Sequence, residues 1–373
     1  MRPAAPYTLP VPGVSWLTRA RSRYLARAAR TLLEPTVPMP GWLSSAYAGV
    51  REPLADCLRD HQAAFLGALA LPQVGAPLCA GRLEEAIPQL LFELSRRRVL
   101  GREGVWWPGP VPRLLCAPRG IAQVFEPPLV GMLFSDGEVE IAAGKPWDEA
   151  GERAFLPLAD GGWLALQDNN PLAALEAHPD KDGNALSLAG RSGEEWVAAL
   201  NEARALIREA LPELAAEHAS VLAEVVPVGF EPEKSLSASY REAIGVVYLT
   251  LHPRVAILAE ALIHEVQHNK LNLLSWSDPL IHGDGSLVVS PVRPDPRPVM
   301  GVLLAVHAFL PVAELHRVLL ERGHPAGDPE RLRTVMRQNQ EGLDVVKGVR
   351  TTAAGKELLD GMVALERWQR GAG

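Results

Sequence analysis

The pattern of apolar and polar positions predicts a long buried helix from His252 to Trp276. The segment reads HPRVAILAEALIHEVQHNKLNLLSW, and its apolar residues recur at the spacing of a helix core face. His-Pro marks its start, because proline suits a first helical turn. The preceding run Ala243–Leu251 (AIGVVYLTL) predicts a strand that leads into this helix.

Similar patterns predict further helices and strands along the rest of the chain. Helices are expected over Trp16–Leu33, Leu54–Leu69, Leu83–Leu100, Ser192 to about Glu209, Pro212–His218, Val299–Arg322, and after Asp328 and Thr351 or Thr352. Strands are expected over Glu138–Ala142, Trp163–Gln167, Leu222–Phe230, Ser235–Tyr240 and Ile244–Leu251. The Trp-, Pro- and Gly-rich stretch Val105–Gly120 indicates a loop-like connector.

These elements predict an α+β protein that is mostly helical. The 373 residues are enough for two domains or one large elaborated domain. We expect residues 161–373 to form one domain, in which a small antiparallel sheet lies beside the long helix over His252–Trp276. Residues 1–160 are expected to form a helical N-terminal region, which either recognises a substrate or serves as a scaffold.

Composition narrows the class of protein. An apolar content of 47% with 22% charged residues is that of a soluble globular chain. The net charge of −7 and the lack of a long basic run argue against nucleic acid as a partner. No signal-peptide core and no apolar run of membrane-spanning length appear. Three cysteines, Cys57, Cys79 and Cys116, lack C-x-x-C spacing and suggest reduced thiols in a cytoplasmic protein.

The predicted helix carries the motif H-E-x-x-H, formed by His264, Glu265 and His268. Four residues are close to one helical turn, so both imidazoles project from the same face and can bind one metal ion. The alternative is a helix with two partly exposed histidines and a solvated glutamate. The strongly apolar flanks favour the metal site, because buried polar groups need partners.

A catalytic metal needs a third protein ligand. The long metzincin pattern requires glycine and histidine where the chain has Leu271 and Leu274, so that class is excluded. His307 on the next predicted helix is the preferred third ligand, although a hydrogen-bonded core histidine is an equal alternative. Glu314 on the same helix is the gluzincin-type alternative, and His282 in a Gly-rich loop is a weaker one.

The chemistry depends on the metal. With zinc, Glu265 would be the general base that activates water for peptide hydrolysis. With ferrous iron, open positions could bind a keto acid and dioxygen. The distal carboxylate of α-ketoglutarate then needs a cation, for which arginine is suited. Arg293 and Arg297 in SPVRPDPRP are candidates, unless this is a surface loop whose arginines pair with Asp295.

Five segments occur in a specific order between Ser235 and Leu320: SLSASY, IGVVYLTL, LIHEVQHNKL, PVRPDPRP and a GVLL-type helix. This ordered set resembles the HExxH motif-containing peptide-modification proteins of ribosomal-peptide (RiPP) biosynthesis. The resemblance implies a metallopeptidase (gluzincin)-like catalytic domain and an Fe(II)- and α-ketoglutarate-dependent β-hydroxylation of residues such as Asp or His. It also implies that His264 and His268 are iron ligands, that Glu265 is a metal-adjacent acid, and that Arg293 and Arg297 are candidates for the keto acid.

Three hypotheses follow. The leading one is a peptidyl hydroxylase that uses Fe(II), dioxygen and α-ketoglutarate on a precursor peptide. The second is a zinc metallopeptidase with Glu265 as general base. The third is a non-enzymatic peptide-binding scaffold. Neither nucleic acid nor a membrane is expected as a partner, and a homodimer is left open.

Overall fold

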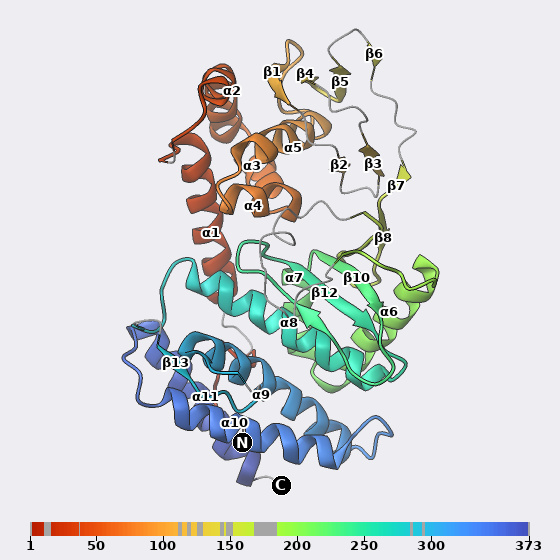
Figure 1. The fold of residues 1–373 in the computed structure, drawn as a ribbon, viewed down its shortest axis with the longest axis vertical. Helices are drawn as coiled ribbons and strands as arrows, with labels where there is room; N and C mark the ends of the chain where they lie inside the picture. Colours follow the sequence, from red (N-terminus) through yellow and green to blue (C-terminus); the bar gives the residue numbers. More distant parts are fainter. Residues whose placement is uncertain are drawn as a thin grey trace.

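Three tiers follow one another along the longest axis of the molecule (Figure 1). N-terminal helices and small strands form the first tier, a mixed sheet with its covering helices forms the second, and C-terminal helices form the third. The protein is therefore mixed α+β and mostly helical, as expected. This computed structural model describes residues 2–10, 16–36, 38–110, 114–117, 121–124, 130–141, 145–146, 152–167, 185–283, 286–292 and 295–371.

The first tier is helical in its first half and consists of strands in its second half. Its helices are α1 (Trp16–Leu33), α2 (Gly41–Asp60), α3 (Gln62–Leu69), α4 (Pro72–Cys79) and α5 (Leu83–Arg96). Its strands are β1 (Val105–Pro110), β2 (Leu114–Ala117), β3 (Ile121–Val124), β4 (Val130–Ser135), β5 (Glu138–Ile141), β6 (Lys145–Pro146) and β7 (Glu152–Arg153). They form sheets of order β1-β4-β5-β6 and β2-β3-β7. The expectation of a helical region over residues 1–160 is therefore wrong from β1 onward.

The stretch Val105–Gly120, expected to be a loop, contains β1 and β2. Strand β1 pairs antiparallel with β4. Side chains alternate along it, because Trp107 is 0% exposed whereas its neighbour Trp106 is 48% exposed. This two-residue period is the signal of a half-buried strand, and the surrounding prolines and glycines mask it in the sequence.

Two helix boundaries also differ from expectation. The helix expected over Leu54–Leu69 is divided at His61 between the end of α2 and the whole of α3. His61 has φ −133° and ψ 44°, which lie outside the helical values and interrupt the ladder. The helix expected to reach Leu100 ends at Arg96.

The second tier is built on a five-stranded sheet of order β11-β12-β10-β9-β8. Its strands are β8 (Phe155–Pro157), β9 (Trp163–Ala165), β10 (Glu224–Phe230), β11 (Ser237–Ala238) and β12 (Val246–Leu251). Strands β9 and β12 run parallel to β10, and only the edge strands β8 and β11 are antiparallel to their neighbours. The expected antiparallel sheet is therefore wrong at its centre. The expected domain boundary at residue 160 falls between β8 and β9, which pair with each other.

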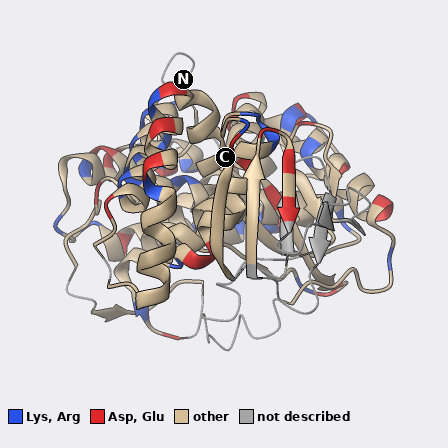
Figure 2. Ribbon diagram, turned by 90° about the horizontal axis from the view of Figure 1, so that it is seen from above, with Lys and Arg blue, Asp and Glu red and all other residues tan. Residues whose placement is uncertain are grey.

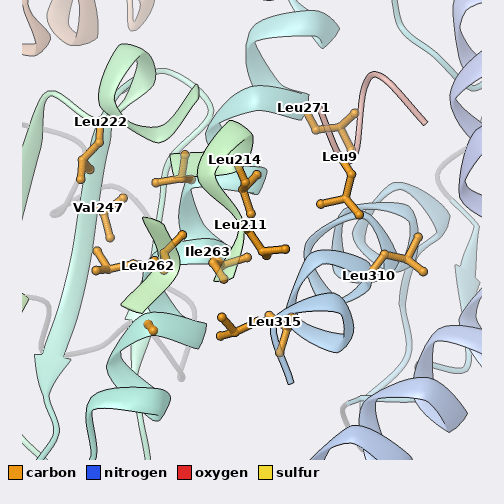
Figure 3. Close-up of a cluster of buried hydrophobic side chains, with 14 of the residues drawn as sticks. Leu9, Leu211, Leu214, Leu222, Val247, Leu262, Ile263, Leu271, Leu310 and Leu315 are labelled. Carbon is orange, nitrogen blue, oxygen red and sulfur yellow. The ribbon is translucent and has the colours of Figure 1, made fainter. Parts of the chain in front are cut away.

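Helices α6 (Gly193–Ala210), α7 (Pro212–Val221) and α8 (Val255–Ser275) accompany this sheet (Figure 1). The capping box expected at Ser192 and Glu195 is confirmed at the start of α6. Figure 3 shows the apolar cluster between α8, its neighbouring helices and the sheet, with labelled side chains at Leu9, Leu211, Leu214, Leu222, Val247, Leu262, Ile263, Leu271, Leu310 and Leu315. The apolar face of α8 is thus buried, as the sequence pattern predicts.

The third tier consists of α9 (Val299–Glu321), α10 (Pro329–Val346) and α11 (Ala353–Gly371), preceded by the hairpin of β13 (Leu287–Val288) and β14 (Arg297–Pro298). Helix α9 packs against both α8 and α10. A Cβ added at Gly342 of α10 would lie only 2.4 Å from Cγ2 of Val306, so the glycine permits this close approach. Asp328 caps α10, as expected, by accepting hydrogen bonds from two backbone amides.

Helix α9 is long and apolar enough to cross a membrane, contrary to the expectation that no such run exists. Within the described residues the bent pair of α3 and α4 meets the same criteria of length and composition. However, 72% of the most apolar window of α9 is buried inside the structure. This burial is typical of the core helix of a soluble protein.

Charged residues of both signs are spread over the surface elements in the view of Figure 2. Acidic residues lie beside basic ones along the helices instead of gathering into a wide patch of one sign. Several of these neighbours form exposed ion pairs, such as Lys347 with Asp344 and Lys356 with Asp360. Exposed pairs of this kind contribute little to stability, about 0–1 kcal/mol each.

Candidate metal centre

Asn269 fixes the rotation of α8 relative to the sheet. Its side-chain oxygen accepts a hydrogen bond from the backbone N–H of Gly245 at 2.7 Å. Its side-chain nitrogen donates to the carbonyl oxygens of Val246 and Glu265 at 3.1 and 3.0 Å. Asn269 is fully buried, so these bonds anchor the helix to the start of β12.

The structure brings His264, Glu265 and His268 together, as the sequence predicts. One side-chain ligand atom from each lies within 4.8 Å of the others. The two imidazole rings are 4.3 Å apart between centroids, and the His268 side chain is 21% exposed. The cluster therefore lies at the edge of the core, where it is open to solvent on one side.

Two ring nitrogens in this cluster are buried and unpaired. Among the described residues, neither Nδ1 of His264 nor Nε2 of His268 has a hydrogen-bond partner. Buried polar atoms are nearly always paired with protein or water. Imidazole nitrogen is a common ligand of divalent transition metals. The two imidazoles therefore fit two of the three protein ligands that a catalytic metal ion needs.

The electrostatics of His264 also suit a metal ligand. Burial lowers the pKa of His264 to about 3, and the neighbouring His268 acts in the same direction. The imidazole is therefore neutral at physiological pH. Neutral imidazole is the form that binds metals, so no proton has to be displaced from His264.

Glu265 is held firmly by its surroundings. It is 2% exposed, and the hydroxyls of Ser237 and Ser239 donate to its two oxygens, each at 2.7 Å. Nδ1 of His268 lies 3.4 Å from the same carboxylate. Burial acts to raise the pKa of Glu265, but the charge and hydrogen bond of His268, together with Ser237, lower it to about 2. Glu265 is therefore a carboxylate that stays ionised.

The two serines were not predicted as partners of Glu265, although a signal existed. They stand at alternate positions in SLSASY, beside and within strand β11. Alternate strand residues point to the same face of a sheet. Two hydroxyls on one face, next to a helix that carries a buried acid, would have indicated the pairing.

Helices α9 and α10 complete the surroundings of His264. The Phe309 ring of α9 lies 4.7 Å from the His264 ring, and the Arg331 guanidinium of α10 lies over Phe309 at 5.8 Å. Glu260, one turn before His264, accepts hydrogen bonds from Arg331 at 2.7 Å and from His316 at 2.9 Å. Sequence reasoning missed these neighbours; the available signal was the four-residue spacing of Glu260, His264 and His268.

Neither expected third ligand reaches the cluster. His307 is buried, and its Nε2 lies 2.9 Å from the carbonyl oxygen of Tyr7. Glu314 instead accepts two hydrogen bonds from Arg317, both at 2.9 Å. The reason is helical geometry: α9 turns Phe309 toward His264, and a residue two positions away lies on the other side of the helix. His307 is thus the hydrogen-bonded core histidine of the alternative interpretation.

Of the two expected arginines, only Arg297 belongs to the described residues, and its ion pair lies away from the cluster. Arg293 lies outside the described residues. Arg297 pairs with Asp295 at 3.6 Å, as in the alternative interpretation. It precedes α9, whereas Phe309 lies ten residues into that helix, roughly 15 Å further along at 1.5 Å per residue.

Comparison with known proteins adds no further assignment. The chain matches no protein-family model, and no curated protein sequence matches it. The structure defines a mostly helical α+β protein with a His–Glu–His cluster that fits a metal ion.

Proposed function

We propose that the protein is a non-haem Fe(II)- and α-ketoglutarate-dependent hydroxylase acting on a ribosomally synthesised peptide. His264 and His268 would be two of the ligands that hold the iron. The cosubstrates are α-ketoglutarate and dioxygen, and the product carries a hydroxyl on the β-carbon of a residue such as Asp or His. The observation that carries the proposal is the environment of Glu265, which separates this chemistry from peptide hydrolysis.

A hydrolytic Glu265 would have to exchange protons with a water molecule. A general base works best when its pKa lies near the working pH. Here the carboxylate is buried, both oxygens accept serine hydroxyls, and its pKa is lowered to about 2. A carboxylate held by both serines is fixed on its protein neighbours, which limits its freedom to exchange protons with a water molecule. The arrangement therefore favours the oxygenase over the zinc peptidase.

In the proposed enzyme, Glu265 positions rather than reacts. Its oxygen near Nδ1 of His268 fixes the orientation of that ring, as carboxylates commonly do for metal-bound histidines. Ser237 and Ser239 hold the carboxylate in turn. Bound iron would supply the activation of dioxygen, coupled to oxidation of the keto acid. Phe309 covers one side of His264 and excludes water there.

The test is a coupled assay on one preparation. The full chain is purified without oxygen, loaded with Fe(II) or Zn(II), and mixed with α-ketoglutarate and candidate peptides before air is admitted. Iron-dependent succinate, together with a peptide mass gain of one oxygen atom, is expected. Zinc retention with a shortened peptide and no succinate would contradict the proposal and favour the peptidase.

Glu265→Gln separates the two chemistries further. Serine hydroxyls can rotate to accept as well as donate, so the amide can occupy the same site. The hydroxylase should lose about 10- to 100-fold in rate, as for other partners of metal ligands, whereas loss of a general base costs roughly 100- to 10,000-fold. His264→Ala should abolish both products, and His61→Ala, at the exposed junction of α2 and α3, is the matched control.

A further inference from the structure

Four partly exposed side chains form a continuous strip across three helices. His268 and His264 of α8 are 4.3 Å apart between ring centroids, and Phe309 of α9 follows at 4.7 Å. The guanidinium of Arg331 on α10 lies 5.8 Å from the Phe309 centroid. We call this set the His–Phe–Arg strip. It places two metal-binding rings, an apolar ring and a cation in that order.

Arg331 is held in place before any ligand arrives. Its Nε and Nη2 lie 2.7 and 2.6 Å from the same oxygen of Glu260. The other oxygen of Glu260 accepts a hydrogen bond from Nε2 of His316 at 2.9 Å, while Nδ1 of His316 accepts from the N–H of Asp328 at 3.2 Å. A side chain fixed in this way loses little conformational entropy on binding.

The guanidinium keeps donors available for a ligand. Arg331 uses only Nε and Nη2 toward Glu260, and within the described part of the chain no hydrogen bond involves its Nη1. Its side chain is 35% exposed. Guanidinium groups bind carboxylates through paired N–H donors. Arg331 can therefore accept an anion while Glu260 continues to hold it.

Building on the proposed function, we infer that Arg331 binds the distal carboxylate of the α-ketoglutarate cosubstrate. This keto acid has a metal-chelating 2-oxo acid group at one end, two methylenes in the middle and a second carboxylate at the other end. The order of the His–Phe–Arg strip matches that order of groups. Phe309 provides an apolar surface for the methylenes, and Arg331 provides the cation.

Arg331 thereby takes the role that the sequence suggested for Arg293 and Arg297. Arg297 is paired with Asp295 and precedes the start of α9, whereas Phe309 lies near the middle of that helix. Arg333, two residues after Arg331 on α10, is 68% exposed and pairs with Glu330. Arg333 is therefore a matched control, because it is an arginine of the same helix whose contact within the described residues is Glu330 and not the strip.

The test compares two keto acids on the same protein. Pyruvate has the same chelating end as α-ketoglutarate and lacks the distal carboxylate. Binding of each to the Fe(II)-loaded full chain is measured by titration calorimetry without oxygen, so no turnover occurs. The wild-type protein should bind α-ketoglutarate more tightly than pyruvate. In Arg331→Gln, the affinity for α-ketoglutarate should fall by about 10- to 100-fold, which is the range for a hydrogen bond to a charged group. The affinity for pyruvate should not change.

Two further variants make the result specific. Arg331→Lys keeps a cation beside Glu260 but lacks the planar guanidinium, so its affinity for α-ketoglutarate should also fall while its affinity for pyruvate does not. This variant provides the test if Arg331→Gln does not fold. Arg333→Gln should bind both acids like the wild type. Equal weakening of both acids, or no weakening, in the Arg331 variants would overturn the inference and leave the proposed function standing. Failure of the wild-type protein to bind either acid would overturn both.

Discussion

Helix α8 carries two groups of buried polar side chains that differ in how they are partnered. Asn269 forms three hydrogen bonds and Lys270 forms an ion pair with Glu217 at 2.6 Å, although both residues are 0% exposed. Within the described residues, His264 and His268 instead each keep an unpaired buried nitrogen. Polarity alone therefore does not mark a functional site. Unpaired ligand atoms grouped at the edge of the core do.

Substitutions in the two groups of side chains should affect different properties of the protein. Residues with satisfied partners hold α8 on the sheet, so their removal should reduce stability and leave metal binding intact. The histidines with unpaired nitrogens contribute less to folding. Their removal should abolish metal binding and change the stability of the metal-free protein little. This division between residues that hold the helix and residues that bind metal is testable at individual positions.

The largest effect is expected on metal binding. His264→Ala and His268→Ala should each weaken Fe(II) binding by more than about 100-fold, since even partners of metal ligands contribute 10- to 100-fold. Metal content after anaerobic dialysis, measured by mass spectrometry, gives the result. His282→Ala, in the exposed loop after α8, should retain full stoichiometry. Retention of iron by both motif variants would show that the metal lies elsewhere.

The next largest effect is expected at Lys270. Lys270→Met leaves Glu217 without its cation, and breaking a buried ion pair in this way costs about 3–5 kcal/mol. Urea unfolding of the metal-free protein measures this loss, and iron stoichiometry should not change. Lys347→Met, which removes an exposed ion pair with Asp344, should cost about 0–1 kcal/mol. Equal losses in the two variants would contradict the division.

A smaller effect is expected at the serines that hold Glu265. Ser237→Ala and Ser239→Ala each remove a hydrogen bond to a buried carboxylate and should cost about 1–3 kcal/mol. The exposed Ser45, whose hydroxyl donates to the Gly41 carbonyl, provides the control substitution to alanine. If the Ser237 and Ser239 variants unfolded like the control, the serines would not hold Glu265.

The last effect concerns the pH dependence of stability and leaves the stability above pH 6.5 unchanged. The folded-state pKa of His264 is about 3, below the unfolded value of 6.5. The unfolded chain therefore binds the proton, so this stabilisation is complete above pH 6.5 and is lost progressively as pH falls toward 3. In metal-free His264→Ala, the slope of stability against pH should fall by about 1.4 kcal/mol per pH unit in that window. Urea midpoints at several pH values measure it, and an unchanged slope would contradict the assignment.

Features determined by nearby residues were predictable from sequence. The helix that carries the motif, the capping box at Ser192 and Glu195, and the Asp328 cap are confirmed, because each depends on residues within one or two helical turns. The cluster of His264, Glu265 and His268 follows from helical spacing alone.

Features determined by distant partners were not predictable. The apolar run of β12 gives no direction for its neighbour, so the parallel pairing with β10 was missed. The face that α9 turns toward His264 depends on packing against α8 and α10, which a single histidine such as His307 does not reveal. Arg331 is 67 positions from His264 in the chain, and only the tertiary fold brings it to Phe309.

The central claim is that His264 and His268 hold one iron atom. Crystals of the full chain grown with Fe(II) without oxygen, with diffraction recorded at the iron absorption edge, test it most directly. The account predicts a single anomalous peak between the two imidazoles, beside Glu265 and on the side of Phe309. A peak at other residues, or no peak in iron-loaded crystals, would contradict it.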